Sequence, residues 1–278
     1  MTAPELTPWD TVQIARHAQR PHTLDYIRGL TEDFVELRGD RRFGDDAAMI
    51  AGVGRFAGQT VAILGHQKGS NTKENLKHNF GSPHPEGFRK ALRIMQHAAK
   101  FGFPLLCFID TSGASPNLAS EERGQAEAIA ENLLVMADLP IPIVATVIGE
   151  GGSGGALAIG IADRLLMLEH AVYSVASPEA SAAILWRDGA QAPEAAAAMR
   201  ITARDLAEFG IIDEVIPEPE GGAHLDPVAV IAQVRTALQQ HLDAIAAHSI
   251  SALLEQRYHK YRRIGVVHER QAALFDSR

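Results

Sequence analysis

The chain has 278 residues, of which 46% are hydrophobic and 22% charged, with a formal net charge of −8 and one cysteine. These values are typical of a soluble globular protein, and the negative charge argues against nucleic acid as the main partner. The single cysteine, Cys107, excludes an internal disulfide and a cysteine-based zinc site within this chain. The first residues lack the layout of a signal peptide, and no apolar run reaches the roughly 18 residues of a membrane span, so we expect a cytoplasmic protein.

Short strands alternate with helices along the chain. The first forty residues are polar, and we expect a helical N-terminal extension over residues 1–40. The hydrophobic pattern then predicts, in order, strands at 48–56 and 60–65, a helix at 86–102, a strand at 104–110, a helix at 121–136, strands at 143–148, 164–169 and 172–175, and two helices within 227–270. This order indicates an α/β fold with largely parallel pairing, and the short connections favour a stack of β-β-α turns over a doubly wound sheet.

A glycine-rich stretch, residues 149–155, follows the predicted strand at 143–148. We expect a turn here, followed by a short helix whose unpaired N–H groups point back at the turn. Such an arrangement is suited to binding an anion or a developing oxyanion. The alternative is a purely structural role, in which the glycines form a packing turn that lets a helix lie against a strand.

Two other motifs fit the same residues. Glycines at the first, third and sixth positions of the stretch match a dinucleotide-binding fingerprint, but too few residues follow for a crossover helix. The glycines around Ser153 match a nucleophile elbow, and Asp213 and His224 follow in the order of a serine hydrolase. These three residues therefore form a candidate catalytic triad.

Seven motifs occur together, in the order found in one known family. They are residues 65–69, 79–81, 85–91, 121–125, 149–160, 177–179 and 221–224. On these motifs the chain resembles the α subunit of bacterial acetyl-CoA carboxylase carboxyltransferase, from about Trp9 to Gly265. The resemblance implies a crotonase-like spiral of β-β-α units over residues 41–226, followed by a helical C-terminal extension over residues 227–278.

The resemblance also implies a reaction and its partners. We expect transfer of a carboxyl group from carboxybiotin, held on a biotin carboxyl carrier protein, to acetyl-CoA, which gives malonyl-CoA for fatty acid synthesis. The expected partners are a β subunit in an α2β2 heterotetramer, and biotin carboxylase. Zinc is expected only on the β subunit, and no metal is expected in this chain, whose twelve histidines show no ligand spacing.

Backbone amides are the catalytic groups that the resemblance implies. The family's biotin-side donors correspond to Gly154 and Gly155, and the loop residues Gly113 and Ala114 are expected to add a second contribution. Both would stabilise negative charge developing on an oxygen. The neighbouring residues Gly151 and Gly152 are expected to contact substrate.

Three cations are candidate ligands for the phosphates of CoA. Lys68 could bind a phosphate or a carboxylate, although an exposed loop lysine would look the same in the sequence. Arg89 and Lys90 could belong to a basic rim around the site, or to a solvated helix face.

Two loops depart from the family pattern. Residues 112–117 lack a proline, a tyrosine and a glycine that the family has, and Ala180 and Ser181 replace its glycine and cysteine. Losing the proline frees the loop, and losing the tyrosine removes contact surface. A non-catalytic paralogue is therefore an alternative. So is a stand-alone hydratase or isomerase that would use Glu150 and Glu179 as acid and base.

Overall fold

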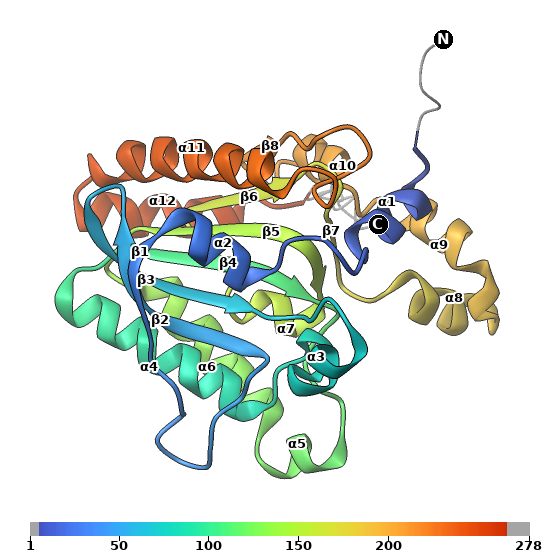
Figure 1. Ribbon diagram of the computed structural model, residues 1–278, viewed down its shortest axis with the longest axis horizontal. Coiled ribbons are helices and arrows are strands. Elements are labelled where there is room, and N and C mark those ends of the chain that lie inside the picture. The colour runs from blue at the N-terminus through green and yellow to red at the C-terminus, as the bar shows by residue number, and fades with distance from the viewer. Residues whose placement is uncertain (1–5, 266–278) are drawn as a thin grey trace, which may run out of the picture.

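The computed structural model describes residues 6–265, and one eight-stranded sheet forms its centre (Figure 1). The strands are β1 (Glu32–Glu36), β2 (Met49–Phe56), β3 (Gln59–His66), β4 (Leu105–Thr111), β5 (Ile143–Gly152), β6 (Arg164–Leu168), β7 (Val172–Ser174) and β8 (Glu214–Ile216). They lie in the order β1-β2-β3-β4-β5-β6-β8, and β7 pairs with the end of β5. The outer parts of the predicted extensions, residues 1–5 and 266–278, lie outside the described residues.

The sheet is antiparallel on one side and parallel on the other. Strands β1, β2 and β3 pair antiparallel, and β2 and β3 form the predicted hairpin, whose turn residues Ala57 and Gly58 have φ angles of 46° and 81°. From β3 onward, β4, β5, β6 and β8 run parallel, which confirms the predicted α/β class with largely parallel pairing. Because parallel strands end at the same edge, the carboxyl ends of β3, β4 and β5 lie together.

Helices cover both faces of this sheet. They are α1 (Pro8–Ala15), α2 (Thr23–Leu30), α3 (Thr72–Lys77), α4 (Pro85–Phe101), α5 (Leu118–Glu122), α6 (Gln125–Asp138), α7 (Ser153–Leu157), α8 (Pro178–Trp186), α9 (Ala192–Met199), α10 (Ala203–Glu208), α11 (Pro227–Ala246) and α12 (Ile250–Arg262). Figure 1 shows α11 along one face and α4 and α6 along the other. Helix α4 is the predicted helix at 86–102. It stops at Gly102, whose left-handed φ of 70° ends the hydrogen-bond ladder.

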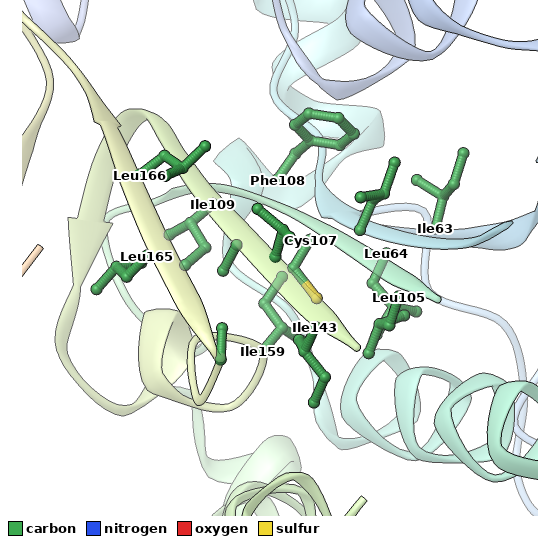
Figure 2. Close-up of a cluster of buried hydrophobic side chains, with 14 of the residues drawn as sticks. Ile63, Leu64, Leu105, Cys107, Phe108, Ile109, Ile143, Ile159, Leu165 and Leu166 are labelled. Atoms are coloured by element: carbon green, nitrogen blue, oxygen red, sulfur yellow. The ribbon is translucent and has the colours of Figure 1, made fainter. Parts of the chain in front are cut away.

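The hydrophobic core fills the space between the parallel strands and the helices. Ile63, Phe108, Ile143 and Leu166 come from four neighbouring strands, and all are fully or almost fully buried (Figure 2). Cys107 lies in the same core on β4, and burial raises the pKa of its thiol well above the usual range. The cysteine is therefore a small apolar core residue with no nucleophilic role.

Three element boundaries differ from the sequence predictions. The first part of the glycine stretch is strand, because β5 continues through Gly152 and pairs there with β7. The turn is confined to the change from strand to helix at Ser153. Helix α7 begins at Ser153, inside the stretch instead of after it. The predicted helix at 121–136 is divided into α5 and α6, because Gly124 adopts a left-handed φ of 81°.

The predicted N-terminal helical extension also contains a strand. Residues 32–36 form β1, which pairs antiparallel with β2 at the edge of the sheet. Its side chains are largely exposed, so the segment lacks the apolar alternation by which a sequence reveals a half-buried strand. At the other end, α11 and α12 are the two helices predicted for the C-terminal part, as far as the described residues extend.

Helices α8, α9 and α1 form an arm beside the sheet (Figure 1). Helix α8 is apolar on nearly all sides, yet Ile184 and Leu185 are 76% and 66% exposed. Val175, just before the helix, and Trp186, at its end, are also exposed. A helix that is apolar all round is normally buried, so the arm presents a surface suited to another polypeptide.

Candidate active site

The glycine stretch places backbone amides at the end of β5. Gly152 is the N-cap residue of α7, and no side chain caps this helix. The first N–H groups of a helix have no carbonyl partner inside it, which leaves the amides of Gly154 and Gly155 available to a ligand. Ser153 has a φ of 53°, a left-handed conformation uncommon for serine, and it turns the chain sharply from strand into helix.

The loop that follows β4 lies directly against this turn. A Cβ added to Gly155 would lie 2.6 Å from the backbone nitrogen of Ala114 and 2.7 Å from the carbonyl carbon of Gly113. A Cβ on Gly152 would collide with the backbone of Ser112. The structure therefore brings together the two backbone segments that the sequence proposed as amide donors, and it shows why glycine is required in the turn.

The amides of Gly113 and Ala114 have different surroundings. The N–H of Gly113 donates to the hydroxyl of Thr111 at 3.0 Å, so this amide already has a partner. Among residues 6–265, the amide of Ala114 makes no hydrogen bond. Of the two predicted loop donors, Ala114 is the one whose N–H can meet a ligand.

The diverged loop is held by contacts of its own. The N–H of Ser115 donates to the carbonyl of Pro83 at 3.0 Å, and Gln125 donates to the carbonyl of Ser115 at 2.9 Å. Asn117 caps α5 by accepting the N–H of Ser120 at 2.8 Å. These bonds hold the residues that follow Ala114 in place, although the loop lacks the family's proline and tyrosine.

A buried group of charges lies behind the glycine stretch. Lys68, Asp110 and Glu150 follow or end three neighbouring strands, β3, β4 and β5. The ammonium of Lys68 lies 2.8 Å from Asp110 and 2.7 Å from Glu150. Burial opposes the charge on Lys68, but the two carboxylates outweigh it and raise the pKa of the lysine. Lys68 thus has a structural partner on each side, and its predicted role in binding substrate stays a prediction.

Arg16 extends this charge group toward the arm. Its guanidinium contacts Glu150 at 2.6 Å and Glu179 of α8 at 2.5 Å. Burial acts to raise the pKa of both glutamates, but Lys68 and Arg16 lower that of Glu150, and Arg16 lowers that of Glu179. Both glutamates are held as anions, so they are poorly suited to the acid and base roles of the hydratase alternative.

Asp110 and Arg16 are not among the site residues predicted from the sequence. Asp110 could have been found as a charged residue at the carboxyl end of a predicted parallel strand, the edge at which α/β proteins bind ligands. Arg16 gives no comparable signal, because its partner Glu150 is 134 positions away in the sequence.

An apolar cavity of about 340 Å³ opens beside the turn. Ser153 and Gly154 form part of its wall. The other lining residues are Leu157, Gly160, Ile161, Leu165, Tyr173, Ser174, Val175, Leu206, Ile211, Tyr261 and Ile264. A ligand in this cavity would meet apolar walls and the start of α7.

The other predicted cations are bound inside the protein. Arg89 contacts Asp40 and Glu86 at 2.9 Å each, and it donates to the carbonyl of Arg123 at 3.0 Å. Lys90 is fully buried and contacts Asp45 at 2.6 Å. Both side chains tie α4 to neighbouring loops, and their assignment to CoA phosphates stays a prediction.

The candidate hydrolase triad is not assembled. Asp213 accepts the N–H of Leu165 and pairs with Lys260, whereas His224 stacks on His17 with ring centroids 3.7 Å apart. Neither residue contacts Ser153 in the described part of the chain. The structure thus gives the hydrolase alternative no support.

Residues 6–265 hold neither a metal-ligand cluster nor a membrane-spanning helix. This part of the chain contains no group of three or more His, Cys, Asp or Glu side chains placed to hold a metal ion. None of its helices is both long and apolar enough to cross a membrane.

The chain is similar to proteins of known sequence over nearly its whole length. The family model described as acetyl co-enzyme A carboxylase carboxyltransferase-like matches residues 2–265. The acetyl-coenzyme A carboxylase carboxyl transferase subunit alpha of Heliobacterium modesticaldum is 57% identical over 262 residues, covering 94% of this chain and 78% of the relative. The protein of the same name from Listeria welshimeri is 58% identical over 261 residues, covering 94% and 82%.

Solved structures share the fold at low identity. Transcarboxylase 12S superposes with a TM-score of 0.67 at 19% identity, over 88% of this chain and 46% of that one, so this chain spans about half of it. A subunit of a Pseudomonas malonate decarboxylase hetero-tetramer gives a TM-score of 0.67 at 20% identity, over 84% and 91%.

The shared fold and the similarity to the named relatives thus make this chain a carboxyltransferase with a crotonase-like fold, as the sequence predicted. Within that class, the chain belongs to the acetyl-CoA carboxylase carboxyltransferase α-subunit family. The non-catalytic paralogue finds no support in these comparisons.

Proposed function

We propose that this chain is the α half of a carboxyltransferase that moves a carboxyl group from carboxybiotin to acetyl-CoA and forms malonyl-CoA. The observation that carries the proposal is the apposition of two backbone segments, the start of α7 and the loop after β4. Their closest point is the contact between Gly155 and Ala114. Such an arrangement concentrates amide donors where negative charge develops on an oxygen.

The chain's own backbone supplies the chemistry that we assign to it. Carboxybiotin, held on a carrier protein, supplies the carboxyl group. The amides of Gly154 and Gly155, with that of Ala114, would face the ureido oxygen and stabilise its developing charge. The turn is accessible to this group at Ser153 and Gly154, which line the apolar cavity beside it. Apolar walls exclude water, which strengthens these hydrogen bonds.

No side chain of this chain is assigned as a general acid or base. The two glutamates of the hydratase alternative, Glu150 and Glu179, are paired with cations and have lowered pKa values. The charge group behind the turn fixes the geometry, and the amides contribute the electrostatic stabilisation. Gly151 and Gly152 complete the turn as backbone contacts.

The second substrate is proposed to bind on another polypeptide. We place acetyl-CoA on a β subunit with its own zinc ribbon, joined to this chain in an α2β2 heterotetramer. The carrier protein and biotin carboxylase complete the set of partners, and the assembly is proposed to be cytoplasmic. The exposed apolar arm around α8 supports an extensive contact with another chain.

Co-expression with the β subunit of the same organism tests the proposal. We expect malonyl-CoA to form from carboxybiotin and acetyl-CoA when both subunits are present, and no transfer by either subunit alone. Ser153→Ala should retain activity within about tenfold, because the serine contributes its backbone and not its hydroxyl. Transfer by this chain alone, or selective labelling of Ser153 by a fluorophosphonate, would contradict the assignment.

A further inference from the structure

Strand β5 bulges where it passes the end of β4. Ile109 of β4 pairs with Val147 of β5, and the next pair along the strands is Thr111 with Gly151. A single residue of β4, Asp110, therefore faces three residues of β5. Bulges change the direction of a strand, and they are frequent beside active sites.

The carboxylate of Asp110 fills this bulge. It accepts the backbone N–H of Glu150 at 3.1 Å, in place of the regular bond between strands that the bulge interrupts. A Cβ on Gly149 would collide with the same carboxylate, which explains why glycine precedes Glu150. The Asp110 side chain thus sets how far the end of β5 departs from β4.

Buried partners hold Asp110 in place. Lys68 contacts one carboxylate oxygen at 2.8 Å, and Nδ1 of His22 lies 3.1 Å from the other. Gly81 covers the pair, because a Cβ there would lie 2.7 Å from the Lys68 side chain and 2.9 Å from the Asp110 carbonyl. Burial acts to raise the pKa of Asp110, but Lys68 and His22 lower it, which keeps the residue an anion.

Both amide segments begin at the hydrogen bond between Asp110 and the backbone of Glu150. The loop with Ala114 follows Asp110 directly along the chain, and the turn with Gly154 and Gly155 follows Glu150. We propose that Asp110 is a positioning residue for carboxyl transfer, which fixes the bulge of β5 and thereby sets the Gly154 and Gly155 amides opposite the Ala114 amide. It acts through the backbone of Glu150 and touches no reacting atom. Its activity readout rests on the function proposed above.

The opposite end of β5 contains a matched control. Asp163 accepts the N–H of Ile143, the first residue of β5, at 2.7 Å, and it pairs with Arg257 at 2.8 Å. Like Asp110, it is a buried carboxylate bonded to one amide of β5 and one cation. Its partner Ile143 begins β5, whereas Gly152 ends it, so Asp163 supports the strand at the end away from the bulge.

The test compares Asp110→Asn, Asp110→Ala and Asp163→Ala in the complex with the β subunit. Asparagine keeps an oxygen that can accept the Glu150 amide, whereas alanine removes it. We expect Asp110→Ala to lower kcat about 100-fold with KM changed less than threefold, because misplacing a catalytic group by about 1 Å has an effect of this size. Asp110→Asn should stay within about tenfold of the parent protein, and Asp163→Ala should leave the kcat of the folded complex unchanged.

Amide hydrogen exchange provides a readout that does not depend on activity. Asp110→Ala should speed exchange at residues 149–155 at least about tenfold, whereas Asp163→Ala should speed exchange near Ile143 instead. The proposal is overturned if Asp110→Asn and Asp110→Ala lose kcat equally, if Asp163→Ala loses as much, or if exchange at 149–155 is unchanged. Absence of transfer by the unmodified complex would refute the proposed function, and exchange would still decide the role of Asp110.

Discussion

The Cα atom of Gly155 lies against the backbone of Ala114, so closely that a Cβ at Gly155 would be 2.6 Å from the Ala114 nitrogen. This contact joins the end of β5 to the loop after β4, two segments about 40 residues apart in the sequence. It determines the spacing of the amides to which we assign oxyanion stabilisation. A side chain here would have to push backbone away from backbone, and neither segment has a flexible end that could yield.

Gly155→Ala should therefore abolish carboxyl transfer, with a loss of about 100-fold or more, because it separates the two amide segments. Gly44→Ala, in the loop before β2, is the control. A Cβ there would meet nothing within 4 Å and the residue lies outside the proposed site, so activity should be unchanged. The measurement is the rate of malonyl-CoA formation by the complex with the β subunit. Equal losses in the two variants would show that the spacing to Ala114 is not the determinant.

The buried His66 should make stability depend on pH. Burial lowers the pKa of His66 to about 3, below its ordinary value of 6.5. The folded state therefore keeps this imidazole neutral, whereas the unfolded chain binds a proton as the pH falls below 6.5. Stability is then lost progressively from pH 6.5 down to about 3, by about 2 kcal/mol between pH 6.5 and 5. Urea unfolding at several pH values gives the free energy of unfolding of the parent and of His66→Gln. This free energy should fall less steeply with decreasing pH in the variant, and an unchanged pH dependence would contradict this account.

Arg257 should be the main anchor of α12. It is 1% exposed, pairs with Asp163 at 2.8 Å, and donates to the carbonyls of Met136, Leu139 and Ile141. Arg257→Met should lower the free energy of unfolding by about 3–5 kcal/mol, because the buried carboxylate loses its partner. Arg28→Ala is the control, since its pair with Asp25 lies at the surface and should contribute less than about 1 kcal/mol. Chemical denaturation measures both, and comparable effects would contradict the distinction.

The apolar arm should be part of a subunit interface. Ile184→Asp places a charge on the exposed face of α8, and it should weaken association with the β subunit at least about tenfold without changing the melting temperature of this chain. Val228→Asp, on the exposed start of α11, is the control and should leave association unchanged. Sedimentation of the mixed subunits measures the effect. Association of the Ile184 variant with unchanged affinity would remove α8 from the interface.

The sequence determined the elements whose signals are local. The spacing of Phe88 and its apolar neighbours gave α4, the β-branched run before Gly149 gave β5, and the residues around Ala57 gave the hairpin. Each depends on a periodicity or a turn preference contained within a few residues. The order of the glycine motifs was sufficient to indicate the family.

Only the tertiary structure decided how the site is assembled. Asp110 supports the bulge at Glu150 from 40 positions away, and Arg16 reaches the same glutamate from 134 positions away. Lys68 is a charged loop residue in the sequence, and it becomes the buried partner of two carboxylates only when β3, β4 and β5 lie side by side. A local pattern cannot reveal such contacts, because sheet order brings the residues together and burial then determines their charge.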